Sequence, residues 1–88
     1  MTEVEVYTTL ICPYCIKAKK LLDRKKVAYR EIRIDQEPGK AEEAVCRSGR
    51  QTVPQIFIGD YHVGGCDELH ALEAEGKLDE LLAGAISP

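Results

Sequence analysis

The chain has 88 residues, a length that suits one small domain and leaves no room for a second hydrophobic core. Apolar residues make up 44% of it and charged residues 31%, which argues against a disordered chain. The net charge of −3 disfavours a nucleic-acid binder, which at this size is usually basic. No apolar run approaches the ~20 residues of a membrane span, and no signal-peptide stretch is visible, so we expect a cytoplasmic protein without membrane contact.

The charged side chains are unevenly distributed. Residues 1–50 hold 11 basic and 8 acidic side chains, whereas residues 51–88 hold one basic and 7 acidic ones. Six of the basic residues fall between Lys17 and Lys26. This cluster is either the solvated face of a helix or a source of positive potential near the first two cysteines.

Hydrophobic periodicity predicts alternating strands and helices in the first half of the chain. Valines alternate with glutamates over 3–8, which indicates a strand. A helix over 13–25 begins with a proline, which fits the first helical position, and carries an apolar stripe at helical spacing. A second strand is expected over 27–34, with the odd-numbered apolar residues on one face and the even-numbered ones on the other.

The second half continues the alternation. The remaining elements are expected at 38–48 (helix), 53–58 (strand), 61–63 (short return strand), 66–75 (helix) and 77–83 (a last helical turn or two). The order β-α-β-α-β-β-α predicts an α/β domain in which helices cover a four-stranded mixed sheet. Strands joined by a helix are expected to be parallel, and the hairpin adds an antiparallel pair.

The strongest motif is Cys12-Pro13-Tyr14-Cys15, which lies where the first strand ends and a helix begins. Residues three apart on a helix share a face, so the two sulfurs come within disulfide reach. Free N–H groups at the helix start favour a thiolate on Cys12. We therefore expect Cys12 to be an attacking nucleophile and Cys15 the more sheltered resolving thiol. The alternatives are two ordinary buried cysteines or half of a zinc site.

With this motif, the blocks Val6-Tyr7-Thr8, 52–58 and 64–69 resemble the glutaredoxins, specifically the dithiol kind with Cys-Pro-Tyr-Cys. The match covers nearly the whole chain. A thioredoxin would be expected to show Trp-Cys-Gly-Pro-Cys, and this chain contains no Trp. The resemblance implies one thioredoxin-fold domain over 1–88, of the short bacterial type.

The resemblance also implies a glutathione-binding site. In the family the proline at Pro54 is cis and faces the dithiol, which frees the Val53 backbone to pair with an extended peptide. The resemblance likewise implies that the corner at Gly65 and Asp67 holds the γ-glutamyl end of glutathione. Simple capping of the third helix by Asp67 is the other interpretation there. The implied glutathione-binding residues are Tyr14, Thr52, Val53, Pro54, Gly65, Cys66 and Asp67.

Two positions depart from the family pattern. Thr9 stands where many relatives have Lys, and Ala41 stands where many have Gln or Arg. In those relatives, the residues at both positions usually bind the glycine carboxylate of glutathione. The two departures therefore predict weaker binding of that carboxylate. Lys17, Lys40 and Arg50 are the candidates to replace them.

The resemblance implies thiol–disulfide exchange with glutathione as co-substrate and with no metal or prosthetic group. A dithiol route uses both motif cysteines, and a monothiol route uses Cys12 alone. The partners implied are glutathionylated proteins, among them ribonucleotide reductase, and the chain is expected to be a monomer.

Three other functions remain open at this point. A redoxin reduced by a flavoprotein reductase is supported only by the two departures above. A carrier that bridges a [2Fe-2S] cluster between two subunits occurs among glutaredoxins. A zinc module would use all four cysteines, but Cys46 and Cys66 lack the spacing of a ligand pair. We interpret the thiols of Cys46 and Cys66 as taking no part in the redox chemistry. His62 is expected to be a strand residue and His70 a surface helix residue, both without a metal role.

Overall fold

The computed structural model describes residues 3–10 and 12–82. In chain order the elements are β1 (Val4–Thr8), α1 (Pro13–Arg24), β2 (Arg30–Arg33), α2 (Lys40–Ser48), β3 (Gln55–Ile58), β4 (Tyr61–Gly64), α3 (Cys66–Ala74) and α4 (Leu78–Leu82). The predicted element order is confirmed, and α4 supplies the last helical turns. Residue 83, the end of the last predicted helix, lies outside the described residues. None of the helices in the described ranges is long and apolar enough to cross a membrane.

The sheet has the strand order β2-β1-β3-β4. β1 is parallel to β2 and antiparallel to β3, and β3 is antiparallel to β4, so the predicted mixed sheet is confirmed. The expectation that helix-connected strands are parallel holds for β1 and β2 but is wrong for β2 and β3. Arg33 at the end of β2 lies beside Thr8, and Gln55 at the start of β3 lies beside Tyr7. The connection through α2 therefore returns to the same end of the sheet, and β3 runs back along β1.

Two strands are shorter than predicted. β2 lacks the first residues of the predicted range 27–34, but the predicted division of faces is correct. Val27 and Tyr29 pack against the larger core cluster, and Ile32 and Ile34 belong to the smaller one. β3 begins after Pro54, because a proline has no N–H to donate to a neighbouring strand.

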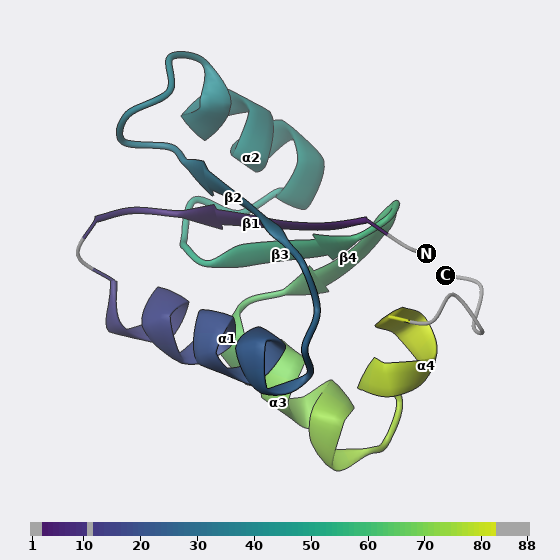
Figure 1. Cartoon of the computed structure of the whole chain (residues 1–88). Helices are drawn as coiled ribbons and strands as arrows, with labels where there is room; N and C mark the ends of the chain where they lie inside the picture. Colours follow the sequence, from purple (N-terminus) through teal and green to yellow (C-terminus); the bar gives the residue numbers. More distant parts are fainter. Residues whose placement is uncertain (1–2, 11, 83–88) are drawn as a thin grey trace.

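Helices cover both faces of the sheet: α1 and α3 lie on one face and α2 on the other (Figure 1). Alternate residues of β1 point to opposite faces of the sheet and pack against the helices there. Val4 and Val6 lie in the larger cluster, which also includes Leu21 and Leu69 of α1 and α3. Tyr7 lies in the smaller one under α2, with Ile32, Ala44 and Phe57. β1 is therefore packed against side chains on both faces of the sheet, and the chain continues from its end into α1.

Polar contacts fix α2 on its face of the sheet. Arg47 donates to Glu5 Oε1 at 2.9 Å and to the Tyr7 hydroxyl at 2.8 Å, and its guanidinium lies 4.0 Å from the Phe57 ring centroid. The Tyr7 hydroxyl in turn donates to Glu43 at 3.0 Å. Burial is the main cause of the raised pKa of Tyr7. These contacts anchor the end of α2, from which the chain continues to Pro54.

Candidate active site

The two motif cysteines lie at the start of α1. Cys12 is its N-cap in an extended conformation, and Pro13 is its first helical residue, as predicted. Cys12 and Cys15 form a disulfide with their Cα atoms 5.2 Å apart, and the Cys15 N–H points at Cys12 Sγ at 3.2 Å. Cys15 is 1% exposed and Cys12 7%, so Cys15 is the more sheltered of the two. In the reduced protein the same N–H and the helix dipole favour a thiolate on Cys12.

The peptide bond between Val53 and Pro54 is cis and lies next to the dithiol. The Val53 carbonyl oxygen is 3.7 Å from Cys12 Sγ. In the disulfide that sulfur carries no proton, so this is a contact; the reduced thiol has a proton to donate there. The arrangement agrees with the cis proline that the family resemblance implied, and it puts the Val53 backbone beside the reactive sulfur.

Gln55 and His62 support the segment that leads into Pro54 through side-chain hydrogen bonds. The sequence did not predict this role. The Gln55 amide nitrogen donates to the Thr52 carbonyl at 3.0 Å and to its hydroxyl at 3.2 Å. With its nitrogen used in this way, the Gln55 amide oxygen accepts from His62 Nε2 at 2.7 Å. Burial is the main cause of the lowered pKa of His62, and it favours the neutral form of the ring. His62 is a strand residue as predicted, but one that positions the loop before Pro54.

A polar cavity of about 190 Å³ lies beside the dithiol. Its lining includes every residue predicted to bind glutathione: Tyr14, Thr52, Val53, Pro54, Gly65, Cys66 and Asp67. The Tyr14 side chain is 56% exposed, so it forms a solvent-accessible part of the cavity wall and does not pack in the core. The structure therefore brings together the residues that the sequence places in three separate blocks.

Arg50 and Glu68 also line this cavity. Glu68 Oε1 accepts from the Gly65 N–H at 3.0 Å and from Arg50 at 2.5 Å. These two contacts, the Gly65 N–H first, lower the pKa of Glu68. Glu68, and not Asp67, therefore makes the capping contact of α3, so the capping interpretation of Asp67 is wrong. A glutamate three residues after the N-cap is the known signal for this contact.

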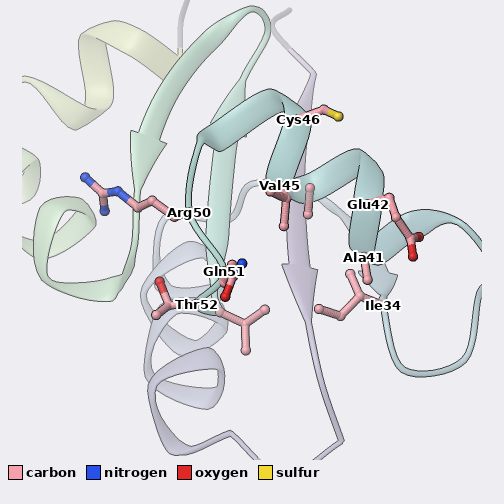
Figure 2. A pocket seen from close by; sticks show the side chains of 10 residues that line it. Ile34, Ala41, Glu42, Val45, Cys46, Arg50, Gln51 and Thr52 are labelled. Carbon is pink, nitrogen blue, oxygen red and sulfur yellow. The ribbon is translucent and has the colours of Figure 1, made fainter.

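A second, apolar cavity of about 450 Å³ lies between α2 and the segment 50–53 (Figure 2). It shares Arg50, Thr52 and Val53 with the polar cavity. Ala41 and Val45 of α2 line it, and in Figure 2 the Arg50 side chain extends away from them. Among the described residues, Arg50 is the one cation that lines this cavity, and its side chain does not extend toward Ala41.

The other candidate cations lie outside these two cavities, although Lys17 lines a neighbouring one with Tyr14 and Asp67. Lys40 forms an ion pair with Glu43 at 2.7 Å and lines neither of these two cavities. Lys17 lies 5.8 Å from the Tyr14 ring centroid. In the basic cluster between Lys17 and Lys26, Lys19 and Lys25 pair with acidic side chains, so two of its six cations are neutralised.

The remaining cysteines lie on different helices, Cys46 on α2 and Cys66 on α3. Cys46 is exposed, and Cys66 is buried, which raises the pKa of its thiol. His70, expected at the surface, is only half exposed, and its buried Nε2 has no hydrogen-bond partner within the described part of the chain. Over residues 3–10 and 12–82, no cluster of His, Cys, Asp or Glu side chains is arranged to hold a metal ion.

A redox-active dithiol between a strand and a helix, opposite a cis proline in a four-stranded mixed sheet, defines a thiol–disulfide oxidoreductase of the thioredoxin fold. The sequence profile of the glutaredoxin family matches residues 4–63. A glutaredoxin from Pseudomonas aeruginosa is 57% identical over 83 residues, which cover 94% of this chain and 99% of the relative. The chain belongs to the glutaredoxin family.

Solved structures agree with this assignment. The solution structure of a glutaredoxin from Brucella melitensis superposes with a TM-score of 0.86 at 52% identity, covering 100% of this chain and 96% of that one. The crystal structure of a buckwheat glutaredoxin–glutathione complex has a TM-score of 0.86 at 36% identity, covering 98% and 83% of the two chains.

Proposed function

We propose that this chain is a glutathione-dependent oxidoreductase that reduces protein disulfides and glutathione mixed disulfides through Cys12 and Cys15. The observation that carries the proposal is the position of Cys12 Sγ, 3.7 Å from the Val53 carbonyl oxygen and beside a polar cavity of about 190 Å³ that Val53, Pro54 and Asp67 help to line. A thiolate at a helix start supplies the nucleophile, and the free backbone beside it supplies a place for an extended peptide.

The dithiol route has two halves. The Cys12 thiolate attacks a substrate disulfide, forms a mixed disulfide and expels one substrate thiolate. The Cys15 thiol loses its proton and attacks Cys12 Sγ, which releases the second substrate thiolate and leaves the Cys12–Cys15 disulfide. One glutathione thiolate then attacks Cys12 Sγ and expels Cys15. A second glutathione attacks the bound glutathione sulfur, so that oxidised glutathione leaves and both cysteines are reduced.

Bound glutathione would lie along the polar cavity. Its cysteinyl backbone pairs with Val53 beside cis-Pro54, and its γ-glutamyl end reaches Gly65, Cys66 and Asp67 at the start of α3. Tyr14 flanks the sulfur, and Thr52 holds the segment through its contacts with Gln55. The buckwheat relative, 36% identical, was crystallised with glutathione, which supports this assignment by similarity.

The physiological setting follows from the same chemistry. A glutathione-driven reductase works where glutathione keeps thiols reduced, which for a bacterial chain is the cytoplasm. We propose glutathionylated proteins and ribonucleotide reductase as its protein substrates, with the chain acting as a monomer. A trapping experiment with a fluorescently labelled Cys15→Ser variant would identify the substrates, because each target protein stays bound to Cys12 as a mixed disulfide.

A coupled assay tests the proposal directly. NADPH oxidation is followed with a glutathione mixed disulfide as substrate, once with glutathione and glutathione reductase and once with thioredoxin reductase alone. We expect turnover only in the first arm. Cys12→Ser should abolish it, whereas Cys15→Ser should retain the monothiol route, and Cys46→Ser serves as the matched control. Turnover with thioredoxin reductase and no glutathione would instead establish the redoxin fed by a flavoprotein.

A further inference from the structure

The polar cavity beside the dithiol has one cation among its lining residues, Arg50, and two acids, Asp67 and Glu68. The guanidinium of Arg50 is paired with Glu68 at 2.5 Å. Within the described residues Glu68 is the sole partner of that guanidinium. The Arg50 and Glu68 side chains are 48% and 41% exposed, so solvent screens the pair.

The two partners are held very differently. Glu68 has a second anchor, because the Gly65 N–H donates to the same carboxylate oxygen at 3.0 Å. Gly64 leaves room for it, since a Cβ there would lie 2.5 Å from Glu68 Oε1. Arg50 lies on the loop after α2, and it lines both cavities that meet at Val53. Glu68 is therefore a fixed group of the site, and Arg50 is a long side chain free to change partner.

We propose that Arg50 binds a carboxylate of the glutathione moiety on Cys12, and that Glu68 holds Arg50 in the free protein as a competing carboxylate. The guanidinium offers paired donors that match a carboxylate, whereas the acids of the cavity suit the ligand's ammonium group. Binding exchanges one exposed ion pair for another, so Glu68 lowers the affinity that Arg50 alone would give. This inference rests on the proposed function and adds selectivity for thiols that carry a carboxylate.

An exchange equilibrium tests this selectivity. In the Cys15→Ser background, Cys12 is loaded with cysteamine, which has no carboxylate, and is equilibrated with glutathione. Glutathione displaces cysteamine by one disulfide exchange, and intact mass spectrometry gives the equilibrium constant. We expect Arg50→Gln to lower that constant about threefold and Glu68→Gln to raise it about threefold, the size typical of exposed ion pairs. Arg50→Lys should recover part of the loss.

Two controls separate this exchange from a general charge effect. Glu68→Gln keeps an oxygen that accepts from the Gly65 N–H. In the Arg50→Gln background this substitution should not raise the exchange constant, because its effect depends on Arg50. Glu75→Gln makes the same charge change at the far end of α3 and should leave the constant unchanged.

The outcomes distinguish this inference from the proposed function. A constant that does not respond to Arg50→Gln contradicts the inference, as does an equal rise for Glu68→Gln with and without Arg50. Both results leave the proposed function standing. A Cys15→Ser parent that accepts no glutathione on Cys12 contradicts the proposed function and the inference together.

Discussion

At the residue scale, Asp35 connects the loop before Cys12 to the end of β2. Its carboxylate accepts from the Leu10 N–H at 3.1 Å and from two nitrogens of Arg33 at 2.8 Å each. The hydrogen bond from Arg33 is the main cause that lowers the pKa of Asp35 to about 2. This side chain thus fixes the approach of the chain to its reactive cysteine.

The lowered pKa of Asp35 predicts an acid-dependent loss of stability. A carboxyl with a lower pKa in the folded than in the unfolded chain stabilises the fold above its unfolded pKa of ~3.9 and loses that effect as pH falls through its folded pKa. Asp35→Asn should therefore lower the urea midpoint at about pH 6 and differ little from the parent at about pH 2. Asp60→Asn, in the exposed β3–β4 turn, is the control. A difference that stays constant over this range would contradict the prediction.

Residues whose type carries a chemical signal were predictable from sequence, and residues that act by position were not. Two cysteines around a proline indicate a dithiol wherever the fold places them, and the cis form of Pro54 was implied by the resemblance to the glutaredoxins. The sequence pattern predicts only that Gln55 lies in a strand, whereas its side-chain amide also donates to Thr52. Arg50 and Glu68 are 18 positions apart, and their pairing depends on the packing of α3 beside the loop after α2.

At the element scale, the junction of β4 and α3 depends on Gly64. Its φ is +111°, a conformation that side chains rarely adopt, and a Cβ would meet the carboxylate that caps α3. We expect Gly64→Ala to lower the free energy of unfolding by about 1–3 kcal/mol, measured by urea unfolding with an unchanged m-value.

Gly39→Ala is the matched control for this junction. Gly39 has a φ of +81°, but no atom lies within 4 Å of the position of a Cβ. Its substitution therefore incurs the backbone strain alone and should cost less than Gly64→Ala. Equal losses for the two variants would show that the carboxylate of Glu68 does not restrict position 64.

Element identities were predictable, and the direction of β3 was not. Pro13 and Gly49 mark two helix ends that the sequence located to the residue, because both act locally. The orientation of β3 depends on which strand it joins. It pairs with β1 on the side opposite β2, a choice made by the whole sheet and invisible in the order of elements.

At the scale of the whole molecule, the helices that carry the site depend on the core between the sheet and α1 and α3. Leu69 is fully buried in that core. Leu69→Ala should lower the free energy of unfolding by about 2–5 kcal/mol, because it removes buried methyl groups and leaves a cavity. Leu10→Ala, at a position 69% exposed, should change it by no more than about 0.5 kcal/mol. A loss below about 1 kcal/mol for Leu69→Ala would contradict this view of the core.

The most direct test of the proposed chemistry is the site at which oxidised glutathione modifies the Cys15→Ser variant. Cys12 is 7% exposed, whereas Cys46 is an exposed free thiol. Exposure alone therefore favours Cys46, and a helix-start thiolate beside a peptide-binding cavity favours Cys12. Peptide mass spectrometry over a time course measures both rates. We predict that glutathione attaches first to Cys12, and attachment to Cys46 at an equal or higher rate would contradict the proposed function.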